Sequence, residues 1–101
     1  METKERKELR DRRGQLLTLL NGWDPAGLLD AGAPRDEYDC IVDNLLDLLS
    51  RTTSETEVTA FLKQEVSEHF GVAAPDAYRF AAKAVAWFRM IDAEQERASE
   101  R

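Results

Sequence analysis

The chain has 101 residues, the size of one domain, and 43% of them are apolar, enough for one modest core. Charged residues make up 34% and the net charge is −6, so most of the exterior is ionic. No apolar run approaches the ~18 residues that span a membrane, the charged N-terminus lacks a secretory signal, and the single cysteine excludes an internal disulfide and a cysteine-built zinc site. We expect one cytoplasmic domain over residues 1–101, without cofactor or metal.

The charge is distributed unevenly along the sequence. Residues 1–13 contain six basic and four acidic side chains, whereas residues 14–47 contain seven acidic side chains and only Arg35 as a base. Such an acidic segment repels phosphate backbones and attracts cationic protein surfaces. We therefore expect a protein partner with a basic surface and no nucleic acid.

Hydrophobic periodicity predicts an all-α fold of four helices, at about 3–20, 34–50, 54–70 and 76–96. The first has a narrow apolar stripe that is concentrated near its C-terminal end, and Asn21-Gly22 is a plausible stop. Residues 1–6 carry mixed charges and are expected to fray. The stripe consists of Leu9, Leu16, Leu17 and Leu20.

The segment after the first helix contains Trp23-Asp24-Pro25. Asp24 is suited to cap a short helical turn near residues 25–29, with Pro25 at its first position and Trp23 directed at the core. This structural interpretation is favoured. The alternative is that Trp23 and the following loop bind a partner, because exposed Trp is a common binding anchor.

The second and third helices have clear start or stop signals. Pro34 suits the first turn of the second helix, Ser54 and Glu57 form a capping box at the third, and Gly71 suits its C-terminal cap. Both have a regular apolar face. Those faces consist of Tyr38, Ile41, Val42, Leu45, Leu48 and Leu49, and of Val58, Phe61, Leu62, Val66 and Phe70.

The fourth helix has two adjacent apolar stripes, so it is expected to lie at the centre of the domain or to be covered partly by another chain. One stripe contains Tyr78, Ala81, Val85 and Phe88, and the other contains Phe80, Ala84, Trp87 and Ile91. If the domain is a homodimer rather than a monomer, Phe80, Trp87 and Ile91 are the expected seam. Residues 97–101 have nothing to bury and are expected to fray.

Four aspartates follow steps of three, four and four residues, which places them on one ridge opposite the apolar face of the second helix. They are Asp36, Asp39, Asp43 and Asp47. No base is interleaved on the ridge, and each adjacent pair costs about 0.2–0.5 kcal/mol. A solvated face is the usual explanation for such a run. The alternative is a docking surface for a cationic protein, extended by Asp30 and Glu37; a metal site is less favoured because the carboxylates splay outward.

Glu65 and His69 are one turn apart near the apolar face of the third helix. A satisfied polar pair at the core margin, with a hydrogen bond to Tyr38 or Tyr78, is favoured. The alternative is acid–base chemistry or a divalent-metal site with nearby carboxylates. No nucleophile motif or phosphate loop accompanies the pair, and Cys40 lies among carboxylates that disfavour its thiolate. We therefore expect no enzyme activity.

These residues together resemble a family of small all-helical bacterial proteins of unknown function. Its pattern is Trp-Asp-Pro-x-Gly, Asp-Glu-Tyr-Asp, a Leu-rich helix, and a Ser-x-x-Glu-capped helix that ends in Glu-x-x-Glu-His-x-Gly. The match spans about residues 17–72, and departs from the pattern at Ala26 and at the extra residues 29–33. The matching positions are Trp23, Asp24, Pro25, Gly27, Asp36, Glu37, Tyr38, Asp39, Ser54, Glu57, Glu65, Glu68, His69 and Gly71.

The resemblance implies a helical fold and no known catalytic activity. Some small acidic proteins of this kind are immunity partners of bacterial toxins. The leading hypothesis is therefore a non-catalytic protein-interaction module, such as an immunity-type inhibitor, that binds a basic partner through the aspartate ridge. The alternatives are a small enzyme or metal-binding domain that uses Glu65 and His69, and a homo-oligomeric structural protein.

Overall fold

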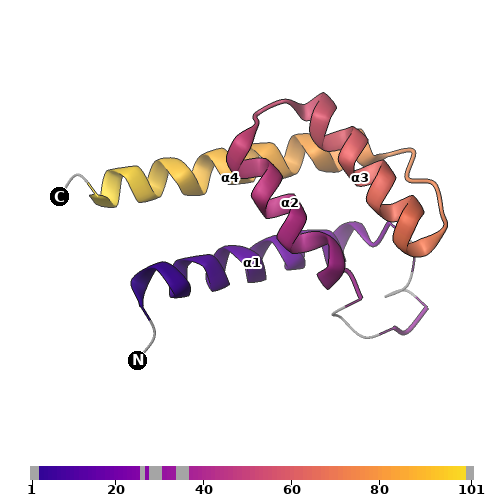
Figure 1. Cartoon of the computed structure of the whole chain (residues 1–101), viewed down its shortest axis with the longest axis horizontal. Coiled ribbons are helices and arrows are strands. Elements are labelled where there is room, and N and C mark those ends of the chain that lie inside the picture. Colours follow the sequence, from indigo (N-terminus) through magenta and orange to yellow (C-terminus); the bar gives the residue numbers. More distant parts are fainter. Residues whose placement is uncertain (1–2, 26, 28–30, 34–36, 100–101) are drawn as a thin grey trace.

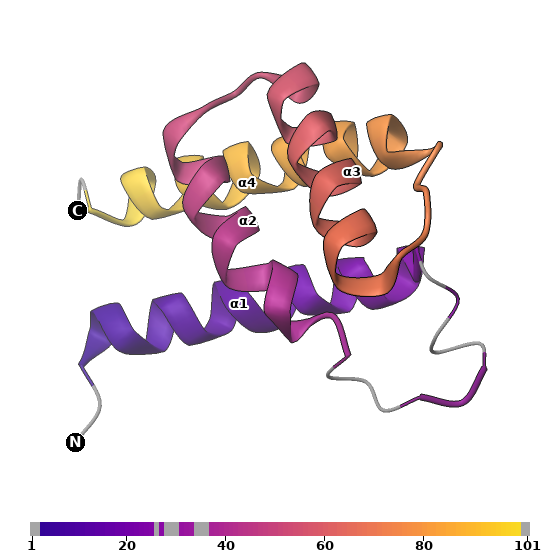
Figure 2. The ribbon, with the colours of Figure 1, turned by 45° about the vertical axis from the view of Figure 1, so that its right-hand side comes forward.

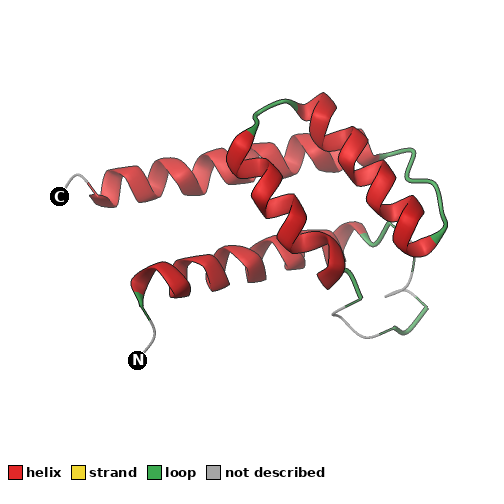
Figure 3. Cartoon of the chain, viewed as in Figure 1, coloured by secondary structure: helices red, strands yellow, loops and turns green. Residues whose placement is uncertain are grey.

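A computed structural model of the chain describes residues 3–25, 27, 31–33 and 37–99, with side chains described up to Gln95. The described residues form four α-helices and no strand, which confirms the expected all-α four-helix fold (Figure 3). The helices are α1 (Lys4–Trp23), α2 (Asp39–Arg51), α3 (Glu55–Phe70) and α4 (Ala77–Ser99). Of these, none is both long and apolar enough to span a membrane.

The two long helices, α1 and α4, run antiparallel, and the shorter α2 and α3 lie across them toward one end (Figures 1 and 2). The first half of α1 and the second half of α4 extend beyond α2 in the same direction, toward both chain termini. The radius of gyration is 14.2 Å, larger than the ~13 Å of a compact domain of this length. We call residues 4–15 and 86–99 the projecting half, and the remainder of the four helices the core half.

The hydrophobic core lies entirely in the core half. In α1 the buried residues begin at Leu16, and in α4 they end at Val85. The largest fully buried side chains come from α1, the start and face of α2, and α3, where they follow the predicted stripes closely. They are Tyr38, Leu16, Leu20, Ile41, Leu45, Leu62, Val42, Val58 and Val66. Alanines of α4, which include Ala81 and Ala84, let that helix approach its neighbours.

Local signals in the sequence place the ends of α3. The Ser54 hydroxyl accepts a hydrogen bond from the Glu57 N–H at 3.2 Å, which satisfies one of the free amides of the first turn. Gly71 ends the helix in the left-handed conformation, with φ of 68°, where a residue without a Cβ is favoured. Both were predicted. At α1, Thr3 caps the helix in the same way through the Arg6 N–H.

The helix boundaries differ from the prediction in three places. Helix α1 continues through Asn21-Gly22 to Trp23, and α4 continues past residue 96 to Ser99. Helix α2 begins at Asp39 instead of residue 34; residues 37–38 form a turn, and residues 34–36 lie outside the described part. Tyr38 explains the later start, because its ring is fully buried and its backbone is not helical (φ −93°, ψ 10°).

Exposure also departs from the predicted apolar stripes at two positions. Leu9, expected on the buried stripe of the first helix, is 58% exposed because it precedes the core half. Tyr78, expected on a buried stripe of the fourth helix, is 54% exposed. In contrast, Leu46 is buried although it was not expected on the apolar face.

Candidate functional site

Trp23 lies inside the fold at the end of α1. Its ring stacks on Phe80 of α4, with centroids 4.7 Å apart and planes 12° apart. The indole Nε1–H also donates a hydrogen bond to Asp76 Oδ1 at 3.2 Å. Trp23 is thus half-buried and joins α1 to the start of α4. The hypothesis that it is a partner-binding anchor is not supported, because its ring face is occupied within the chain.

Asp24 and Tyr38 form a second contact at the same end of the domain. Asp24 is the C-cap of α1, with φ of 49°, and its predicted role as the cap of a following helical turn concerns amides that lie largely outside the described residues. Its carboxylate Oδ1 accepts a hydrogen bond from the Tyr38 hydroxyl at 2.5 Å. The Tyr38 ring also meets the edge of Phe70 of α3, with centroids 5.3 Å apart. The motif residues Trp23, Asp24 and Tyr38 therefore join the ends of all four helices.

The expected helical turn near residues 25–29 lies largely outside the described residues. Where it is described, Gly27 has φ of 67°, which is not right-handed helical, and its N–H donates to the carbonyl of Asp24 at 2.9 Å. The predicted site residues Asp30 and Asp36 also lie outside the described part of the chain.

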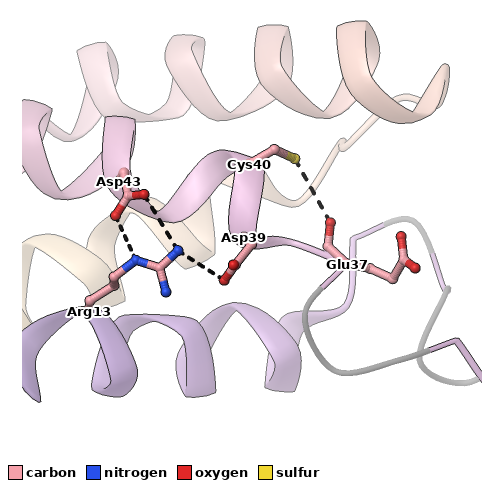
Figure 4. A network of polar contacts seen from close by, with 5 residues as sticks. All are labelled: Arg13, Glu37, Asp39, Cys40 and Asp43. Carbon is pink, nitrogen blue, oxygen red and sulfur yellow. Dashed lines mark hydrogen bonds and ion pairs between the residues drawn. The ribbon is translucent and has the colours of Figure 1, made fainter. Parts of the chain in front are cut away.

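Three aspartates of the predicted ridge are paired with the protein's own arginines, and Figure 4 shows the pairs made by Arg13. The Arg13 guanidinium of α1 lies 2.7 Å from the Asp43 carboxylate and 3.1 Å from the Asp39 carboxylate. The hydrogen bond to Asp43, and to a smaller extent the one to Asp39, raises the pKa of Arg13. Arg51 approaches Asp47 at 2.9 Å. The expectation of an uncompensated ridge is therefore wrong for these three aspartates. Each pair is partly solvent-exposed and contributes only about 0.2–1 kcal/mol to stability.

Carboxylates nevertheless outnumber bases on the surface of α2 and the adjoining side of α3. We call the acidic face the surface formed by Glu37, Asp39, Asp43, Asp47, Glu65 and Glu68. The cations paired with it are Arg13 and Arg51, with His69 beside Glu65. In the part of the chain that the structure describes, this surface therefore keeps a negative balance.

Cys40 lies on the acidic face between Glu37 and Asn44. Its thiol donates a weak hydrogen bond to the Glu37 carbonyl at 3.8 Å (Figure 4). Partial burial raises the pKa of Cys40, and the carboxylates of Glu65, Asp39 and Glu37 raise it further. The sulfur is therefore a neutral thiol near pH 7, as the sequence indicated, because the surrounding field is negative.

Glu65 and His69 are brought together on α3. His69 Nε2 is 3.5 Å from Glu65 Oε2, and Asn44 Nδ2 of α2 donates to Glu65 Oε1 at 3.4 Å. The Glu65 side chain is 12% exposed, so its neighbours satisfy a carboxylate at the margin of the core. Among the described side chains, no group of three or more His, Cys, Asp or Glu is placed to bind a metal ion.

The two tyrosines suggested as partners of that pair are engaged elsewhere. Tyr38 donates to Asp24, and the Tyr78 hydroxyl accepts from Arg79 Nε at 3.0 Å.

The projecting half is held together by polar groups of α1 and α4. Arg12 donates to the Gln95 side chain, which in turn donates to Glu8. The Arg12 guanidinium also lies 4.0 Å from Asp92 and over the Phe88 ring, 5.5 Å from its centroid. Sequence reasoning missed this network, because it joins residues more than eighty positions apart.

The predicted homodimer seam is incorrect for Phe80 and stays a prediction for Trp87 and Ile91. Phe80 is only 4% exposed and stacks on Trp23, so it faces the core rather than a second copy. Trp87 and Ile91 are half-buried, and the indole of Trp87 donates to Gln15 of α1 at 3.1 Å. The large apolar side chains that are exposed in the projecting half are instead Leu9 and Met90.

Among the open hollows lined by the described residues, the following two are large enough to receive side chains. One, of about 350 Å³, lies where α1, α2 and α4 meet, and is lined by Leu9, Arg12, Asp43, Leu46, Asp47, Ser50 and Phe88. We call it the α2 groove, and it adjoins the acidic face through Asp43 and Asp47. The other, of about 770 Å³, lies between α3 and α4 and has Lys63, Tyr78 and Arg79 in its lining.

Comparisons of the chain with protein families, curated proteins and solved structures find no match. The resemblance to the helical bacterial family therefore stays a prediction. The acidic face and the α2 groove are the features of the molecule from which a function can be inferred.

Proposed function

We propose that this protein is a non-catalytic protein-interaction module that binds a partner with a basic surface through the acidic face. The observation that carries the proposal is the excess of carboxylates over bases on α2 and α3, after the intramolecular pairs of Arg13 and Arg51 are taken into account. An immunity-type inhibitor that covers the basic site of a toxin is one specific form of such a module.

The pairing of the aspartates changes how the surface would act. Asp43 and Asp47 remain about two-thirds exposed although each contacts an arginine. Exposed ion pairs are weak, so a basic residue of a partner can share or replace the intramolecular arginine at small cost. The negative field then steers the encounter and fixes its orientation, and buried apolar contacts supply most of the affinity.

Residues that the sequence assigned to the binding surface now divide into three groups. Glu37, Asp39, Asp43 and Asp47 remain candidates for partner contact, and Asp30 and Asp36 stay predictions because they lie outside the described residues. Trp23 is left out of the proposal because its ring stacks on Phe80 and its indole N–H donates a hydrogen bond to Asp76.

The test is affinity capture from a lysate of the source organism, followed by measurement of binding with the purified partner. Asp43→Asn with Asp47→Asn removes two charges from the acidic face. Asp11→Asn with Glu55→Gln removes two charges from exposed positions elsewhere and is the matched control. We expect a basic protein that the wild type and the control retain at low salt and that the face variant loses, with affinity that falls as salt increases.

Equal capture by all three proteins, or binding that does not depend on salt, would refute the proposal. Circular dichroism of each variant verifies that the helices are intact, because exposed ion pairs contribute little to folding.

A further inference from the structure

The α2 groove follows the side of α2 that faces the projecting half, and its lining runs from Asp43 to Ser50. Helix α2 crosses α1 and α4, and both continue beyond it into the projecting half (Figure 1). On an α-helix, residues seven positions apart lie on nearly the same side, so Leu9 continues the stripe of Leu16. Likewise, Phe88 continues the stripe of Ala81 on α4. On that side of α2 these stripes leave the core and meet the surface.

The floor of the groove is apolar and open. It is formed by Leu9 from α1, Leu46 from α2 and Phe88 from α4. Leu46 is 8% exposed, but Leu9 is 58% exposed although it lies on the core-facing stripe. A volume of about 350 Å³ is near the lower limit for ligand pockets, and is suited to a large apolar side chain rather than to a cofactor.

The rim of the groove has a defined charge. Asp43 and Asp47 lie on it, one helical turn apart, with their carboxylates about two-thirds exposed. Arg12 also lines the groove, but its guanidinium is engaged by Gln95, Asp92 and the face of Phe88. Asp43 and Asp47 are also paired with Arg13 and Arg51, so four carboxylates (Asp39, Asp43, Asp47 and Asp92) meet three arginines (Arg12, Arg13 and Arg51) around the rim, a net charge of −1.

We infer that the α2 groove is the anchor site for a basic amphipathic helix of a partner protein. One large apolar side chain of that helix enters between Leu9, Leu46 and Phe88. Two Lys or Arg residues on the same face contact Asp43 and Asp47, whose Cα atoms are separated by roughly 6 Å along the axis of α2. Basic residues three or four positions apart on a helix have a matching separation.

Charge distinguishes this occupant from a second copy of the chain. The protein has a net charge of −6, so two copies repel each other, whereas a basic helix is attracted to the Asp43–Asp47 rim. This inference rests on the proposed function and identifies the kind of partner that the acidic face would bind.

The test uses a synthetic helical peptide of eighteen residues with a central Leu and Lys residues three or four positions to either side, measured by fluorescence anisotropy. Leu9→Ser removes the most exposed apolar side chain of the groove floor. Met90→Ser is the matched control, because Met90 is exposed to a similar degree but does not line the groove. We expect Leu9→Ser to weaken binding at least tenfold and Met90→Ser to change it less than twofold. Replacing the central Leu of the peptide by Ala should give a similar loss with the wild type and little further loss with Leu9→Ser.

The other results separate the inference from the proposed function. If Asp43→Asn with Asp47→Asn weakens binding but Leu9→Ser does not, the anchor site is wrong and the acidic face stands. If neither variant changes binding, or the wild type does not bind the peptide, both fail. If sedimentation equilibrium shows a dimer that Leu9→Ser dissociates, the groove binds a second copy and the inference is overturned.

Discussion

The core half and the projecting half use the same two helices in different ways. In the core half, α1 and α4 are joined through α2 and α3 by buried aliphatic and aromatic side chains. In the projecting half they contact each other through Arg12, Gln95 and Glu8, and through Gln15 and Trp87. Apolar side chains remain there, but two of them, Leu9 and Met90, are exposed.

The two halves contribute differently to the stability of the domain. Burial of apolar surface is the dominant favourable term in folding, so the core half supplies most of the free energy of unfolding. A partly exposed polar network contributes far less, and it leaves apolar side chains free for a partner. The groove that we propose as an anchor site lies where the two halves meet, and the acidic face lies mainly on α2 and α3 of the core half.

The largest expected difference in the free energy of unfolding is between a leucine truncated in the core half and one truncated in the projecting half. Leu45→Ala, at a fully buried position, should lower the free energy of unfolding by about 2–5 kcal/mol through lost burial and a cavity. Leu9→Ala should change it by less than ~0.5 kcal/mol, because that side chain is already exposed. Urea denaturation measures both; similar losses would show that the projecting half is part of the folding core.

A second comparison uses the two tyrosines, one buried in the junction and one on the surface. Tyr38→Phe removes the hydroxyl that donates to the Asp24 carboxylate, and should cost about 1.5–3 kcal/mol, the range for hydrogen bonds to charged groups. Tyr78→Phe should cost less than ~0.5 kcal/mol, since Tyr78 is exposed and its hydroxyl accepts a hydrogen bond from Arg79, which is exposed as well. Thermal or urea unfolding measures both losses of stability. Equal losses would show that the hydrogen bond from Tyr38 to Asp24 contributes no more than the contact of an exposed tyrosine.

The smallest expected effect is local to the projecting half. Arg12→Met keeps an apolar stem near Phe88 but loses the donor to Gln95, so amides of residues 92–99 should exchange with solvent about 2–10 times faster. The free energy of global unfolding should change by less than ~0.5 kcal/mol, as for the control Arg6→Met. If Arg12→Met instead destabilises the whole domain, the two halves form one cooperative unit.

Most of the fold could be predicted from local patterns. The stripe of α3 and its Ser54 and Gly71 caps placed that helix within one residue of both its ends. The start of α2 could not be placed, because Pro34 indicated a helix while the burial of Tyr38 against Asp24 and Phe70 imposed a turn. Helix propensity is a local preference, and tertiary packing overrode it here.

The candidate site was predicted less well than the fold. Periodicity correctly placed Asp39, Asp43 and Asp47 on the outer surface of α2, but one helix cannot reveal that Arg13 of another helix lies beside it. The same limit applies to Trp23, whose stacking partner Phe80 is distant in the sequence. Leu9 was assigned to the core because its stripe is regular, although α2 crosses α1 without covering it.

The amino-acid order alone determined four amphipathic helices, the sign of their surfaces and the neutral state of the one cysteine, because these follow from side chains only a few positions apart. Tertiary structure decided which carboxylates meet an arginine, where the tryptophan ring lies and where an apolar stripe becomes a groove. These depend on the lengths and crossing positions of packed helices, which bring distant residues together and leave others uncovered.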